Sequence, residues 1–156
     1  NRQARTQRQS LTMTISRDDI AYHLDSQFSN FASAIGQTDS HDGSDGYGRD
    51  IDLALRRMGK SRSELATATV EDSQDEAVFA LAEYFAARRL FRQFGAFVNT
   101  KVDDSQFDYK QAQANVKAMM DDAKQECAAL GYDVAASGWS SGFLNLDWIE
   151  AEPEEV

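Results

Sequence analysis

The sequence predicts a mainly α-helical fold: a small helical bundle with two long helices, a short extended arm between them and an extended C-terminal tail. Three observations predict it. The only proline among the 156 residues is Pro153, so no proline ring interrupts a helix before the last residues. Apolar residues recur at steps of three and four along several segments, which is typical of amphipathic helices. Glycine follows most of these segments, where helices commonly end.

The charge pattern divides the chain into three parts. Residues 1–14 form a basic N-terminal arm, with three arginines and no acid. Residues 15–132 are predicted to form one helical domain. Residues 133–156 form an acidic, aromatic C-terminal tail with six acids and no base, in a chain of net charge −10. A body this acidic repels a phosphate backbone at long range, so we expect no specific DNA binding by the helical domain.

The first helix is predicted to begin after Ser16 and to end at Gly36. The Ser16 hydroxyl can cap the first backbone N–H groups, and Asp19 can return a hydrogen bond from the third helical position. One apolar stripe follows, made of Ile20, Leu24, Phe28, Phe31 and Ile35. Glycine is the residue expected just past a helix C-terminus.

A glycine-rich loop and a short helix come next. The loop, 37–48, holds several acids, but no register has the ligand spacing of an EF-hand, so we expect a plain mobile loop and no metal site. A short helix over 50–58 is predicted to close at Gly59. Ser61 and Glu64 then offer a second capping box before a turn.

The first long helix is predicted over 74–94, capped by Asp72 or Ser73 and stopped by Gly95. Near its end lies a cluster of three arginines, Arg88, Arg89 and Arg92. One interpretation is that these cations complement the helix dipole and are solvated. The other is that they form a basic patch that meets acids on a neighbouring subunit.

The second long helix is predicted over 107–130. Residues 97–102 before it form the short strand or extended arm, and 103–105 are the expected cap. A heptad-like seam runs along this helix: Tyr109, Ala112, Val116, Met119, Ala123, Cys127 and Leu130. Such a seam predicts pairing with another helix, with Cys127 as a buried structural thiol.

The C-terminal tail contains both tryptophans of the protein. Its apolar residues are Trp139, Phe143, Leu144, Leu146, Trp148 and Ile149, and part of this set alternates with polar residues as in a strand. Aromatic area is costly to leave in water. We therefore expect these residues to be covered, either by the chain's own core or by insertion into another chain.

No catalytic or cofactor motif is evident in the sequence. Cys127 is the only cysteine, and His23 and His41 have no partner at ligand spacing, so each histidine is expected to be solvated or packed against a ring. There is no phosphate-binding Gly-x-x-x-x-Gly-Lys loop and no complete dinucleotide loop. No apolar run approaches the roughly 20 residues that cross a bilayer. We expect no enzyme, no cofactor and no membrane segment.

A known pattern emerges from three segments. The short helix closes with Leu55-Arg56-Arg57-Met58-Gly59, the alanine-rich long helix contains Leu81-Ala82-Glu83-Tyr84, and the last helix ends in Leu130-Gly131-Tyr132. Over about residues 15–132 the chain resembles the head–tail adaptor (connector) proteins of tailed bacteriophages.

The resemblance implies a homo-oligomeric ring, usually a dodecamer, in the virion neck at the portal vertex, assembled in the host cytoplasm. Such a ring docks beneath the portal protein, extends the DNA channel and attaches the stopper or tail protein, while DNA passes without specific binding. The C-terminal segment commonly engages the portal, which makes the six apolar tail residues the candidate partner-binding site. Candidates for contacts between subunits are Arg88, Arg89, Arg92, Phe97 and Val98.

Two other functions remain open at this point. One is a DNA-packaging protein, similar to a small terminase subunit, in which the basic arm touches DNA. The other is a regulatory helical binding protein that works as an independent module.

Overall fold

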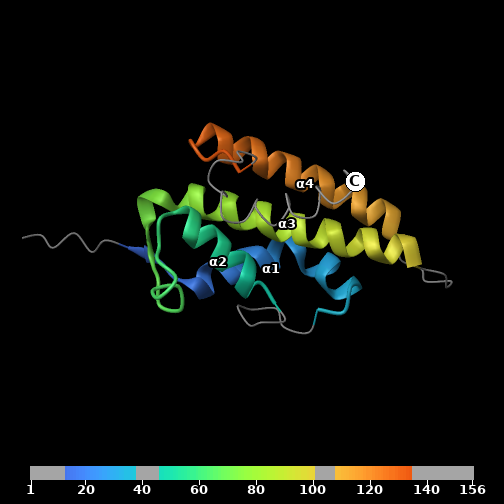
Figure 1. Cartoon of the computed structure of the whole chain (residues 1–156), viewed down its shortest axis with the longest axis horizontal. Helices are drawn as coiled ribbons and strands as arrows, with labels where there is room; N and C mark the ends of the chain where they lie inside the picture. The colour runs from blue at the N-terminus through green and yellow to red at the C-terminus, as the bar shows by residue number, and fades with distance from the viewer. Residues whose placement is uncertain (1–12, 38–45, 101–107, 135–156) are drawn as a thin grey trace, which may run out of the picture.

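The computed structural model describes residues 13–37, 46–100 and 108–134, and it confirms the mainly helical class. The elements are β1 (Thr14–Ile15), α1 (Arg17–Ala34), α2 (Gly48–Arg57), β2 (Val70–Glu71), the 3₁₀ turn η1 (Asp72–Gln74), α3 (Asp75–Thr100) and α4 (Tyr109–Ala129). Helix α3 runs through the middle of the molecule. Helix α4 packs antiparallel along one side of it, and α1 and α2 pack on the other side (Figure 1).

The start and end of α1 are as predicted. Ser16 and Asp19 form the full capping box, with the Asp19 carboxylate accepting from the Ser16 N–H at 2.8 Å and the Ser16 hydroxyl accepting from the Asp19 N–H at 3.3 Å. The first three apolar residues of the predicted stripe are buried against α3 and α2. Gly36 adopts a φ of +81°, a conformation that favours glycine, just after the helix ends.

A two-stranded antiparallel pair, β1–β2, was not predicted from the sequence. Ile15 lies opposite Val70, and both side chains are buried. Each strand has two residues, which is too short for alternation to be recognised. The pair fixes the segment before α1 against the segment that leads into α3.

The prediction that Gly95 stops the first long helix is wrong. Helix α3 continues to Thr100, so Phe97 and Val98 lie in its last turns and not in an extended arm. A glycine inside a helix costs about 1 kcal/mol relative to alanine. Packing offsets this cost, because Phe94 is fully buried and its ring lies 6.1 Å from the ring of Tyr109 at the start of α4.

Helix α4 begins later than expected. Asp108 caps it by accepting from the N–H groups of Lys110 and Gln111 at 3.0 and 3.2 Å, whereas residues 103–105, the predicted cap, lie outside the described residues. Four positions of the predicted seam, Ala112, Val116, Ala123 and Cys127, are buried, Tyr109 and Met119 are partly buried, and Leu130 is exposed. The helix ends at the predicted place, with Gly131 at a φ of +93°.

We predict that Gly95→Ala stabilises the protein by up to about 1 kcal/mol, because alanine favours the helical state. An added Cβ would lie 2.9 Å from the Gln113 Nε2. That amide is the flexible end of its side chain, and moving it away costs only a long hydrogen bond, at 3.4 Å, to the Phe91 carbonyl. The measurement is urea unfolding followed by far-UV circular dichroism.

Gly131→Ala is the matched control for this prediction. Its positive φ should make alanine destabilising by about 1–2 kcal/mol. If Gly95→Ala were as destabilising as Gly131→Ala, alanine would not be favoured at position 95. The explanation that packing offsets the cost of a glycine in this helix would then be wrong.

Candidate functional site

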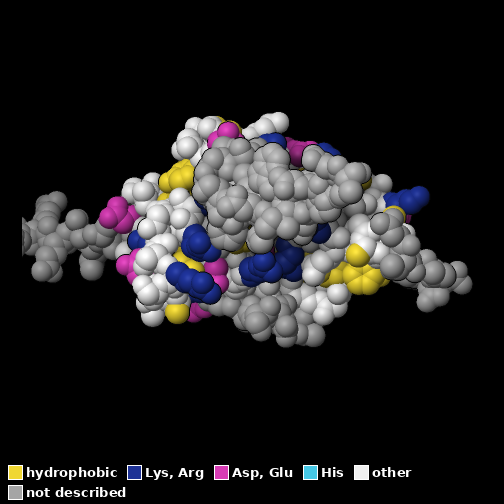
Figure 2. Space-filling view, viewed as in Figure 1, with side chains coloured by type: hydrophobic (Ala, Val, Ile, Leu, Met, Phe, Trp, Pro, Cys, Tyr) yellow, Lys and Arg dark blue, Asp and Glu magenta, His cyan; other side chains and the backbone are white. Residues whose placement is uncertain are grey.

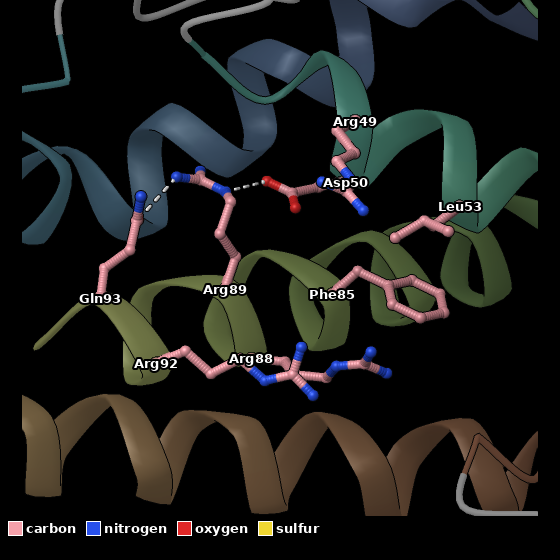
Figure 3. A pocket seen from close by; sticks show the side chains of 8 residues that line it. All are labelled: Arg49, Asp50, Leu53, Phe85, Arg88, Arg89, Arg92 and Gln93. Carbon is pink, nitrogen blue, oxygen red and sulfur yellow. Dashed lines mark hydrogen bonds and ion pairs between the residues drawn. The ribbon is translucent and has the colours of Figure 1, made fainter. Parts of the chain in front are cut away.

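A pocket of about 190 Å³ opens between α2 and α3. It is lined by Arg49, Asp50, Leu53, Phe85, Arg88, Arg89, Arg92 and Gln93. Figure 3 shows that the first three come from α2 and the other five from successive turns of α3. The pocket therefore combines an apolar wall with four guanidinium groups and one carboxylate.

Asp50 and Arg89 form a buried ion pair in this pocket. Asp50 is 1% exposed, and its Oδ2 accepts from the Arg89 Nε at 3.0 Å (Figure 3). The other guanidinium nitrogens of Arg89 donate to the Gln93 Oε1 at 3.1 Å and to the Gln37 Oε1 at 3.0 Å. Arg89 also lies over the Tyr47 ring, 5.8 Å from its centroid. This single side chain thus joins α2, α3 and the segment that follows α1.

Burial dominates the titration of Asp50. Desolvation raises its pKa to about 6, and the nearby positive charges of Arg89 and Arg49 only partly oppose that effect. A carboxylate that loses its hydration needs a close cation, and Arg89 provides one with good geometry. The carboxyl group therefore changes charge in the weakly acidic range.

The remaining arginines of the pocket differ from Arg89. Within the part of the chain that the structure describes, no carboxylate forms an ion pair with Arg49, Arg88 or Arg92. Arg88 and Arg92 lie one helical turn apart on α3, and like charges at this spacing repel each other (Figure 3). Lys and Arg side chains gather over α2 and the adjoining part of α3 in the space-filling view (Figure 2). The pocket is a locally positive site on an acidic protein.

The structure brings some of the predicted site residues together and separates others. Arg88, Arg89 and Arg92 line one pocket, but Arg89 makes its ion pair inside the chain. Phe97 is 38% exposed and stacks on Tyr109, with ring centroids 5.4 Å apart. Val98 is half-buried in the last turns of α3, away from the pocket. The predicted tail residues, Trp139, Phe143, Leu144, Leu146, Trp148 and Ile149, lie outside the described residues.

The sequence alone did not indicate the pocket residues that come from α2. Arg49, Asp50 and Leu53 lie more than thirty positions before their partners on α3, and no local spacing links them. A second long-range ion pair was missed for the same reason. Arg17 contacts the Asp52 Oδ1 at 2.6 Å and also donates to the Leu65 carbonyl at 2.9 Å.

His23 and Cys127 both pack against other side chains of the helical domain. His23 stacks on Phe79 with ring centroids 4.4 Å apart, and its Nε2 lies 2.6 Å from the Glu83 Oε1. His23 was predicted to be either solvated or packed against a ring, and the structure shows the second. Cys127 is buried, and burial raises the pKa of its thiol to about 11, which disfavours the reactive thiolate.

The described ranges hold neither a cluster of metal ligands nor a bilayer-spanning helix. Within 13–37, 46–100 and 108–134, no three His, Cys, Asp or Glu side chains converge as metal ligands. None of the helices in the same ranges has the length and hydropathy of a bilayer span. Comparison of the chain with protein-family models, with curated proteins and with solved structures gives no match.

We predict that Asp50→Asn flattens the pH dependence of stability. The folded state raises the pKa of Asp50 from 3.8 to about 6, so it binds this proton more tightly than the unfolded state does. As pH rises from about 4 to about 6, the wild type should lose stability relative to Asp50→Asn, by about 3 kcal/mol at most. The measurement is the free energy of unfolding in urea across this range for both proteins.

Glu64→Gln serves as the control with the opposite sign. Hydrogen bonds from Ser61 lower the pKa of the exposed Glu64 carboxyl, so the wild type should lose stability relative to this variant as pH falls. A wild-type advantage over Asp50→Asn that stayed constant from pH 4 to pH 7 would show that Asp50 is not a desolvated titrating group.

Proposed function

We propose that this chain is a structural subunit of a phage virion, a head–tail adaptor that assembles into a ring below the portal. The order of its helices supports the proposal: a capped α1, a short α2 and two long paired helices agree with the resemblance noted in the sequence. In this proposal the apolar residues of the tail contact the portal, and Arg88 and Arg92 are the arginines available to an adjacent subunit.

The observation that carries the proposal is the α3–α4 pair. At 26 residues, α3 forms a rod of about 40 Å through the middle of the subunit. Because the two helices are antiparallel, Phe97 at the end of α3 and Leu130 after α4 lie at opposite ends of this rod (Figure 1). Both are exposed large apolar residues, 38% and 36% accessible. A ring that joins two different structures needs contact surfaces at two opposite ends.

The surface of α4 fits a subunit that has neighbours on its sides. Its buried residues form a single stripe, and the rest of the helix faces outward with lysines and acids mixed. The rim of a protein interface is polar and solvent-accessible, so this face can lie at the edge of a contact but not at its centre. A heterologous contact between such surfaces closes into a ring when the rotation between subunits allows it.

The charge of the chain supports a role around DNA without recognition of its sequence. With a net charge of −10, the protein repels phosphate at long range, which would keep DNA from adhering during passage through a channel.

We predict that the full chain, alone or mixed with its portal protein, forms closed rings with one mass and one copy number. Negative-stain images and mass photometry of the particles measure this directly. The matched variants are Phe97→Ser and Leu130→Ser, which should leave the helix content unchanged and weaken the stacking of rings on portal particles. A chain that stays monomeric at high concentration and in the presence of portal particles would contradict the adaptor function.

A further inference from the structure

The arginine pocket has positive charge that the described chain does not neutralise. Its one acid, Asp50, already accepts from Arg89. Arg49, Arg88 and Arg92 therefore present three cations around a cavity of about 190 Å³, and Leu53 and Phe85 supply an apolar wall. Guanidinium groups bind carboxylates through paired hydrogen bonds. The pocket thus has the chemistry of a site for acidic side chains that lie next to an aromatic or aliphatic one.

The described chain ends near Arg57, the last residue of α2, which also lies near the pocket residue Arg88. Burial lowers the pKa of Arg57, while the negative charge of Asp133 raises it and the positive charge of Arg88 lowers it. Both Asp133 and the pocket residue Arg88 therefore lie within electrostatic range of the same side chain on α2. Val134, the last described residue, is buried, so the chain is anchored where it leaves the core.

The sequence beyond this point has the complementary chemistry. Residues 147–156 contain five acids and no base, together with Trp148 and Ile149. Residues 135–146, which connect this segment to Val134, can span up to about 40 Å when extended. That is about the whole length of α3, so the segment can reach a pocket on the middle turns of the same helix.

We propose that residues 147–156 of the same chain dock in the arginine pocket of the free subunit. The carboxylates of this segment pair with Arg49, Arg88 and Arg92, and Trp148 covers the apolar wall. A short tether gives the segment an effective concentration in the millimolar range, which favours docking within one chain over docking between chains. The docked tail covers its aromatic surface until a partner competes for it. This inference concerns the subunit before assembly and does not require that a ring forms.

Fluorescence of Trp148 tests the proposal in the full chain. In a Trp139→Phe background, Trp148 is the only tryptophan, and its emission maximum and anisotropy report the tail alone. Arg88→Glu/Arg92→Glu should shift the emission to longer wavelength and lower the anisotropy. Raising the ionic strength from about 0.1 M to about 1 M shortens the Debye length from about 10 Å to about 3 Å and should move both signals in the same direction.

Two further variants separate docking from loss of fold. Lys110→Glu/Lys124→Glu changes the net charge by the same amount on the exposed surface of α4 and should leave Trp148 emission unchanged. Neutralisation of the tail in Asp147→Asn/Glu150→Gln/Glu152→Gln leaves the pocket intact and should reproduce the shift seen with the arginine variant. Far-UV circular dichroism checks that every variant keeps its helix content.

Three results would overturn the proposal. The first is Trp148 emission and anisotropy that do not respond to either the pocket variant or the tail variant. The second is a signal that changes on dilution, because it would assign the pocket to the tail of a second copy. The third is binding of a labelled DNA duplex that Arg88→Glu/Arg92→Glu abolishes while Trp148 emission stays constant, which would assign the pocket to phosphate.

Discussion

Burial of α3 on both of its sides is the constraint on which the rest of the structure depends. Leu81, Leu90 and Phe94 on this helix are fully buried, and α4 packs along one side while α1 and α2 pack along the other (Figure 1). A helix that is apolar around most of its circumference needs neighbours on each side. The alanines between these large residues, Ala82, Ala86 and Ala87, are fully buried as well, and their small side chains allow close approach.

Because much of α3 is covered, some of its polar side chains pair with residues on the helices that cover it. Glu83 contacts His23 of α1, and Arg89 contacts Asp50 of α2. Desolvation makes such pairs weak contributors to stability, as the raised pKa of Asp50 shows. Their effect is on geometry, since α1 and α2 can each satisfy the pair only in one position along α3. The pocket opens beside Arg88 and Arg92, for which the described residues provide no carboxylate in an ion pair.

Local rules predicted the parts of the fold that depend on neighbours in sequence. The capping box at Ser16 and the glycine after α4 are set within one helical turn, and both were predicted correctly. Gly95 was misread because its helix is stabilised by packing of Phe94 against α4, which no local rule contains. The arginine cluster on α3 was visible in the sequence. Which arginine pairs inside the chain depends on Asp50, 39 positions away, and could not be predicted.

The choice between arginine and lysine differs between the helices. Helices α2 and α3 carry six arginines and no lysine, whereas α4 carries three lysines and no arginine. The cation of α1, Arg17, is also an arginine that contacts two other segments of the core. Lysine is a strongly hydrated point charge suited to an outer face, and arginine holds a fixed planar geometry against carboxylates and rings. The cations between α2 and α3 are thus arginines, which make directed contacts. A binding pocket requires this property, whereas a solvated surface does not.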